Sequence, residues 1–178
     1  MHLGAKKLAF LGLLAAITVV LIILSGVFDF NTLFLLAAAS FCVGIAFRET
    51  GIRIAAGFCM ASIILGLLLA PNKFHCITFA AMGIYLLASE YSYDRLVKLK
   101  NQQHRKRLLW IVKYLIFNIM YIPSLIFLPR LFYEGKVSQS ILLILIVAGQ
   151  AGLFIYDMAY VYFQGYIWSK LRRNLGLQ

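Results

Sequence analysis

The sequence predicts an all-α polytopic membrane protein whose six transmembrane helices form one bundle, with both termini in the cytoplasm. Hydrophobic residues make up 63% of the 178-residue chain and charged residues only 13%, whereas a soluble domain carries about 25% charged residues. Six apolar stretches fill most of the chain. The Lys and Arg residues gather in every second gap between these stretches. No polar linker divides the chain, so residues 1–178 are predicted to form a single domain.

The apolar stretches predict spans over residues 8–27, 32–47, 52–70, 74–91, 108–128 and 140–168. Each span is expected to be helical, because backbone polar groups inside hydrocarbon must bond within their own segment. The first stretch follows Lys6 and Lys7, as the apolar core of a signal peptide would. At about 20 residues it suits a complete crossing, and no convincing small-residue cleavage site follows it. We therefore interpret it as a retained helix.

The later spans differ in length and in their breaks. The second is short and is expected to tilt little or to thin the bilayer locally. Pro71 and Asn72 mark the turn between the third and fourth spans. Pro123 lies inside the fifth and should kink it or free a carbonyl group there. The sixth is longer than a crossing needs, so it is expected to tilt strongly or to project beyond the bilayer.

The distribution of basic residues predicts the orientation. One side of the membrane receives fourteen of the 17 Lys and Arg residues: Lys6, Lys7, Arg48, Arg53, Arg95, Lys98, Lys100, Arg105, Lys106, Arg107, Lys113, Lys170, Arg172 and Arg173. The other side receives only Lys73, Arg130 and Lys136. Positive charge marks the cytoplasmic side, so both termini are predicted to be cytoplasmic. The formal charge of +11 is then explained by orientation and by anionic lipid at the inner face, without a nucleic-acid partner.

Motifs of catalysis and cofactor binding are absent from the sequence. It contains no HExxH, GxSxG, P-loop or GxGxxG pattern, and its three histidines are scattered along the chain. Cys42, Cys59 and Cys76 are evenly spaced but match no metal-ligand motif, so they are interpreted as small buried hydrophobic residues. We therefore expect neither catalysis nor a cofactor or metal.

Three charged residues lie at depths where hydrocarbon disfavours ionised groups. Asp157 lies in the cytoplasmic half of the sixth span, Lys113 lies just inside the fifth, and Glu90 closes the fourth. A structural ion pair of Asp157 with Lys113, with Glu90 as a further member, explains all three. A proton or ion relay, helix capping, or snorkelling to the interface are the alternatives.

Polar residues near mid-depth and near the outer face could line a pocket for a small polar molecule. Asn118 and Gln150 are expected near mid-depth, where interhelical hydrogen bonds are the alternative. The residues expected near the outer face are Asp29, Asn31, Asn72, Lys73, His75, Tyr121, Ser124, Arg130 and Gln139. Small residues form a second pattern: Ala9, Gly12 and Ala16 share one face of the first helix, and Gly57 with Ala61 repeats the spacing in the third. Such faces permit close helix packing within a bundle or against another protein.

The chain resembles the membrane-embedded S components of energy-coupling factor (ECF) transporters, which capture vitamins and other micronutrients. The resemblance covers the whole chain in size, six-helix layout and cytoplasmic termini. Locally it is carried by KKLAFLGLLAAI, LLLAPNKFHCITFAAMGIYLLASEY and VKYLIFNIMYI; no substrate-specific motif is present. It implies a bacterial cell-membrane protein that binds its substrate near the outer face and works with a T component and cytoplasmic ATPases.

The resemblance also implies roles for particular residues. The face formed by Ala9, Gly12 and Ala16 would contact the T component. Because substrate contacts in the family come from the later helices and outer loops, the candidate substrate-binding residues are Lys73, His75, Asn118, Tyr121 and Gln150. Asp157 and Glu90 lie too far toward the cytoplasm for that pocket. Two other readings remain: a non-catalytic scaffold that binds partners, and an intramembrane enzyme that uses Asp157 with Lys113 or Glu90.

Overall fold

The structure is a computed structural model, and it describes residues 4–97, 101–127 and 139–174. Most of these residues lie in helices, and no strand occurs among them. In chain order the elements are α1 (Ala5–Ser25), the 3-10 turn η1 (Asp29–Asn31), α2 (Thr32–Thr50), α3 (Ile52–Leu69), α4 (Lys73–Leu96), α5 (Gln102–Phe127), α6 (Gln139–Tyr162), the π-helical segment η3 (Phe163–Trp168) and α7 (Ser169–Asn174).

The all-helical prediction is confirmed for the described residues, and each predicted span coincides with a helix. Within the described ranges, five helical segments are long and apolar enough to cross a membrane: α1, α2, α3, α5 and the continuous stretch Ser140–Asn174. The fourth predicted span corresponds to α4, which is long enough but is not among these five. His75, Glu90, Asp94 and Arg95 reduce its hydropathy.

The chain divides into two compact units, which are described separately. The first unit is Met1–Lys113 and the second is Tyr114–Gln178, so the boundary lies within α5. The prediction of a single domain stays a prediction.

In the first unit, α2 is the central helix and contacts α1, α3 and α4. Its fully buried residues Leu36, Ala39, Val43 and Ala46 recur at intervals of three or four positions, as the helical period requires for one face. Gly51 joins α2 to α3 with a φ of 81°. Only glycine adopts this backbone conformation without strain, so this residue defines the turn.

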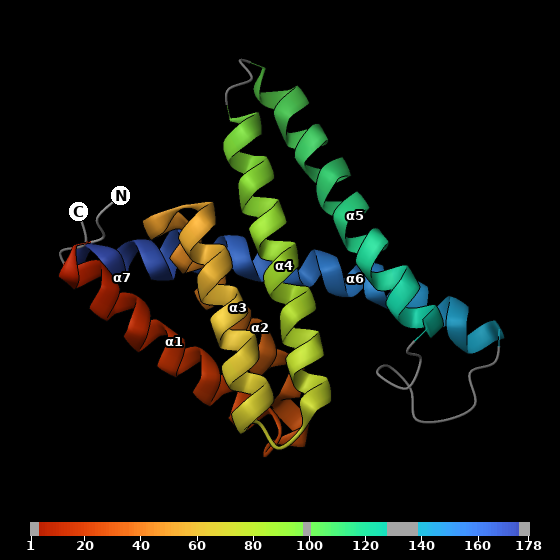
Figure 1. Cartoon of the computed structure of the whole chain (residues 1–178). Coiled ribbons are helices and arrows are strands. Elements are labelled where there is room, and N and C mark those ends of the chain that lie inside the picture. The colour runs from red at the N-terminus through yellow and green to blue at the C-terminus, as the bar shows by residue number, and fades with distance from the viewer. Residues whose placement is uncertain (1–3, 98–100, 128–138, 175–178) are drawn as a thin grey trace. The chain divides into compact units, whose positions relative to one another are not determined.

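Two matched contacts between cysteine and glycine hold α3 against α4, which lie side by side (Figure 1). A Cβ atom placed on Gly66 of α3 would lie 3.3 Å from Sγ of Cys76 in α4. A Cβ atom on Gly83 of α4 would lie 3.0 Å from Sγ of Cys59 in α3. In each helix the glycine follows the cysteine by seven residues, so the two antiparallel helices present the same pattern to each other. All three cysteines are buried and free, which confirms their interpretation as packing residues.

In the second unit, α6, η3 and α7 form one continuous helical stretch (Figure 1). Its length agrees with the prediction that the sixth span exceeds a simple crossing. Leu153, Asp157, Tyr160, Gln164 and Trp168 are buried along it, at intervals of three or four residues. These five residues therefore define one buried row on this stretch.

Candidate functional site

The predicted substrate-binding residues fall into two groups. Lys73 and His75 lie at the start of α4 in the first unit. Asn118 and Tyr121 of α5 and Gln150 of α6 lie together in the second unit. Arg130, which was expected near the outer face, lies outside the described residues, as do Lys98, Lys100 and Lys136 of the basic-residue pattern.

An amide pair joins α5 to α6 in the second unit. Nε2 of Gln150 donates to Oδ1 of Asn118 at 2.7 Å, and Nδ2 of Asn118 donates to the carbonyl oxygen of Tyr114 at 2.8 Å. Oε1 of Gln150 is buried and has no hydrogen-bond partner among the described residues. Leaving a buried acceptor unpaired costs about 1–3 kcal/mol. A bound hydrogen-bond donor would remove that cost.

Tyr121 makes a second connection between the same two helices. Its hydroxyl donates to the carbonyl oxygen of Leu145 at 2.7 Å, and its ring stacks on Phe117 with centroids 4.8 Å apart. Gly149 lies directly under the Tyr121 ring, and a Cβ atom at this position would overlap the ring. The tyrosine can reach Leu145 only because residue 149 has no side chain.

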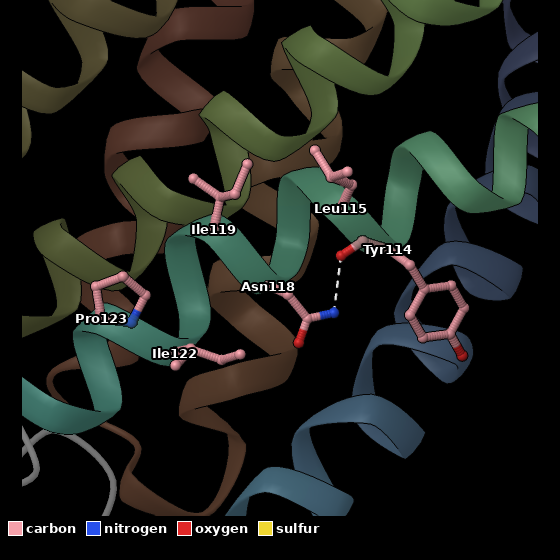
Figure 2. A pocket seen from close by; sticks show the side chains of 6 residues that line it. All are labelled: Tyr114, Leu115, Asn118, Ile119, Ile122 and Pro123. Carbon is pink, nitrogen blue, oxygen red and sulfur yellow. Dashed lines mark hydrogen bonds between the residues drawn. The ribbon is translucent and has the colours of Figure 1, made fainter.

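An open depression of about 540 Å³ is lined by residues of α5: Tyr114, Leu115, Asn118, Ile119, Ile122 and Pro123. Figure 2 shows that the amide of Asn118 is turned back along the helix toward Tyr114 in this mainly apolar lining. Pro123 has no N–H group, so the carbonyl oxygen of Ile119 lacks its usual helical donor. This surface suits an apolar group that carries a hydrogen-bond donor.

Lys73 and His75 take part in contacts at the turn between α3 and α4. Nζ of Lys73 donates to the carbonyl oxygens of Leu67 and Ala70, the latter at 2.9 Å. A cation at the end of a helix stabilises its last carbonyl groups. Both ring nitrogens of His75 have partners: Nδ1 lies 3.0 Å from Oγ of Ser25, and Nε2 lies 3.2 Å from Nδ2 of Asn72. A substrate role for either residue stays a prediction and requires an exchange of these partners.

The small-residue face of α1 lies on the exposed side of the helix. Ala9, Gly12 and Ala16 are all exposed, and no atom lies within 4 Å of a Cβ placed on Gly12. Gly57 and Ala61 of α3 are likewise exposed, and a Cβ on Gly57 meets nothing within 4 Å. These small residues are therefore not used for packing inside the first unit.

Glu90 forms an ion pair with Arg48, a partner that was not predicted from the sequence. Nη2 and Nε of Arg48 lie 2.8 Å and 3.2 Å from Oε1 of Glu90, and Nε lies 3.3 Å from Oε2. The Glu90 side chain is only 7% exposed. Lys113 lies over the ring of Trp110, with Nζ 5.7 Å from the ring centroid. Asp157 is buried, and its pairing with Lys113 stays a prediction.

The buried row on the last helical stretch contains polar residues that were not predicted from the sequence as site residues. Gln164 is 2% exposed, and its Nε2 lies 3.2 Å from the hydroxyl of Tyr160. Gln164 is the second residue of the π-helical segment, which begins at Phe163, and such segments often occur at functional sites. The spacing of Asp157, Tyr160 and Gln164 in the sequence was the signal that could have identified this row.

The described residues contain no group of three or more His, Cys, Asp or Glu side chains arranged to hold a metal ion. Comparison of the chain with protein-family models, with curated proteins and with solved structures yields no match.

Proposed function

We propose that this chain is a substrate-capture subunit, an S component, of an ECF-type uptake transporter in a bacterial cell membrane. In this proposal it binds a vitamin-like small molecule and catalyses no reaction. A separate T component and cytoplasmic ATPases supply the energy for release. The chain crosses the membrane six times and has both termini in the cytoplasm.

The packing of α4 supports the sixth crossing. One cysteine–glycine contact attaches α4 to α3 close to the turn between them, and the other attaches it about halfway along both helices. A helix α3 that crosses the bilayer would therefore place α4 in the bilayer as well. The polar side chains of α4 have partners inside the first unit: His75 contacts Ser25, and Glu90 contacts Arg48. Satisfied polar groups reduce the cost of placing such a helix in hydrocarbon.

The positions of the charges in the first unit support the orientation. Exposed basic side chains occur at the start of α1, the end of α2, the start of α3 and the end of α4, namely Lys6, Lys7, Arg48, Arg53 and Arg95. In this four-helix arrangement those ends belong to one end of the unit. The opposite end carries Lys73, which caps α3. Anionic lipid headgroups at the inner face are the expected partners of the basic end.

The exposed small-residue face of α1 supports a protein partner. A face that only meets lipid gains little from small residues, whereas a face that packs on another helix gains close backbone approach. In the capture proposal the partner is the T component. The same exposed face also fits the scaffold alternative, in which the chain binds partners but no small molecule.

The observation that carries the binding proposal is the buried, unpartnered Oε1 of Gln150 beside Asn118. A ligand with an N–H or O–H group would supply the missing donor, and its apolar part would lie on the α5 surface around Ile119 and Ile122. The carbonyl group of Ile119, to which Pro123 cannot donate an N–H, offers a second acceptor. The ligand expected from this chemistry is a largely apolar small molecule that carries hydrogen-bond donors.

The first prediction is that gently purified protein retains a stoichiometric small molecule in native mass spectrometry. The substitution Gln150→Leu should weaken binding of that molecule by roughly 10-fold or more, because a buried acceptor is lost. Gln103→Leu, at an exposed position at the start of α5, is the matched control and should bind normally. An empty wild-type protein that shows no thermal shift with a panel of vitamins and related metabolites would favour the scaffold alternative.

A further inference from the structure

The last helical stretch, α6 with η3 and α7, is longer than one crossing of the membrane. The segment Ser140–Asn174 has 35 residues. At the usual helical rise it is about 52 Å long, whereas the hydrocarbon of a bilayer is about 30 Å thick. Residues 140–161 alone span about 33 Å. A crossing that begins at Ser140 therefore leaves the hydrocarbon near Tyr162.

The exposed side chains of this stretch change character at the same position. Between residues 141 and 161 every exposed residue is apolar or glycine. From Tyr162 onward the exposed residues include Tyr166, Lys170 and Arg173. No Asp or Glu follows Asp157 in the sequence, so the charged residues at this end are all basic. Tyrosine prefers the membrane interface, and basic residues mark its cytoplasmic side.

Tyr162, Tyr166 and Lys170 follow one another at intervals of four residues on the exposed side of this stretch. The two tyrosine rings stack, with centroids 5.6 Å apart and an angle of 22° between their planes. They are 62% and 60% exposed, so the stack is open to the surroundings. Residues three or four apart are neighbours on a helix surface. Lys170 therefore follows the ring pair by one turn, and Arg173 follows Lys170 on the same side.

The end of α4 in the first unit shows how a tyrosine and a cation at this spacing interact. Arg95 follows Tyr91 by four residues, and its Nε and Nη2 atoms donate to the Tyr91 hydroxyl at 3.1 Å and 2.7 Å. The guanidinium carbon lies 5.0 Å from the centroid of the ring. In the proposed topology both helix ends belong at the inner face of the membrane, so the same combination of residue types occurs at two inner helix ends.

The π-helical segment beside the tyrosines suits the boundary of the membrane. Oγ of Ser169 donates to the carbonyl oxygen of Gly165 at 2.6 Å and lies 3.2 Å from that of Tyr166. Serine side chains satisfy backbone groups in this way where a membrane helix departs from regular α-helical bonding. A Cβ atom placed on Gly165 meets nothing within 4 Å, so the surface next to the rings is open to a ligand.

We propose that Tyr162, Tyr166, Lys170 and Arg173 form a binding site for the headgroup of an anionic phospholipid of the inner leaflet. The lipid phosphate lies between the ammonium group of Lys170 and the guanidinium group of Arg173, and the tyrosine rings lie beside the glycerol region. Arginine binds phosphate through charge-assisted hydrogen bonds, and each basic residue near an anionic surface strengthens binding. The site rests on the proposed topology but not on substrate capture, because neither tyrosine lines the α5 depression.

The second prediction is tested on the full-length protein, labelled with 3-fluorotyrosine, in lipid nanodiscs. Replacing part of the phosphatidylcholine with phosphatidylglycerol should shift the ¹⁹F resonances of Tyr162 and Tyr166, which are identified by their loss in Tyr162→Phe and Tyr166→Phe. The double substitution Lys170→Gln with Arg173→Gln removes both cations. It should weaken the response to phosphatidylglycerol by about 10-fold or more in a titration of the lipid.

Arg53→Gln with Lys106→Gln is the matched control, because it also removes one exposed arginine and one exposed lysine but leaves the last helical stretch unchanged. This variant should respond as the wild type does. An equal loss in the two double variants, or no shift in the wild type, would overturn the lipid site and leave the capture proposal untouched. Glycerol phosphate in solution should not reverse the shift; reversal would show that the site binds a soluble phosphate instead of a lipid.

Discussion

Replacing Arg48 with alanine is expected to destabilise the first unit more than any other single truncation at its basic end. The carboxylate of Glu90 is buried and accepts three contacts from the Arg48 guanidinium, so Arg48→Ala leaves a buried charge without this partner. Breaking a buried ion pair costs about 3–5 kcal/mol. Because the Arg48 side chain is 39% exposed, water can partly replace it, and we expect a loss of about 3 kcal/mol. Thermal unfolding in detergent measures this loss.

Two further variants make the result specific to the ion pair. Arg53→Ala removes an exposed charge at the same end of the unit and should change stability by less than about 0.5 kcal/mol. The double variant Arg48→Met with Glu90→Leu replaces both charges by apolar groups, and it should recover most of the lost stability. Equal effects of Arg48→Ala and Arg53→Ala, or no recovery in the double variant, would contradict this role of the pair.

The substitution Gly149→Ala is expected to separate α5 from α6 in the second unit. The added methyl group would overlap the Tyr121 ring, and Tyr121 would lose its hydrogen bond to the carbonyl oxygen of Leu145. Overpacking of this kind costs about 1–3 kcal/mol. Because Asn118 and Gln150 join the same helices, the substitution should also weaken ligand binding. Thermal unfolding and native mass spectrometry measure the two effects.

Gly152→Ala provides the matched control, because Gly152 lies one turn further along α6 and a Cβ atom there meets nothing within 4 Å. This change should stabilise the helix by about 0.5–1 kcal/mol. In a Tyr121→Ala background, Gly149→Ala should behave like Gly152→Ala, because the Tyr121 ring that the added methyl group would overlap is absent. If Gly149→Ala is tolerated in the wild type, the packing of Tyr121 on Gly149 is not as described.

The positions of the helices could be predicted from the sequence because each depends on local signals. Long apolar stretches indicate the helices, and Pro71 with Asn72 marks the turn that the structure places between α3 and α4. Gly51 and its positive φ produce the short turn that separates α2 from α3. These helices and turns are determined by residues that are neighbours in the chain.

The pairing of side chains could not be predicted, because it depends on how helices rotate against each other. Arg48 and Glu90 are 42 residues apart, and the sequence predicts for Arg48 only a position at the cytoplasmic end of its helix. Cys59 and Cys76 showed regular spacing, but their meaning required the glycines that they face in the neighbouring helix. Likewise, the sequence predicts His75 only as a polar outer residue, because its contact with Ser25 depends on how α1 packs against α4.

The candidate site was predicted in part. Asn118, Tyr121 and Gln150 were chosen for their depth, and the structure brings them together on α5 and α6. Gly149 was not selected, although the close approach of the Tyr121 ring depends on it. The buried polar residues at the π-helical segment were also missed, because a π-helical segment has no clear signature in a single sequence.

The proposed membrane topology depends on whether α4 crosses the bilayer. We would add one cysteine at a time at Lys6, Val27 or Gln103, keep the three buried native cysteines because two of them hold α3 against α4, and label intact cells with a membrane-impermeant maleimide. Six crossings predict that only the cysteine at position 27 reacts, while those at positions 6 and 103 react after the cells are opened. Labelling of position 103 in intact cells, with position 6 still protected, would show that α4 does not cross and would contradict the account.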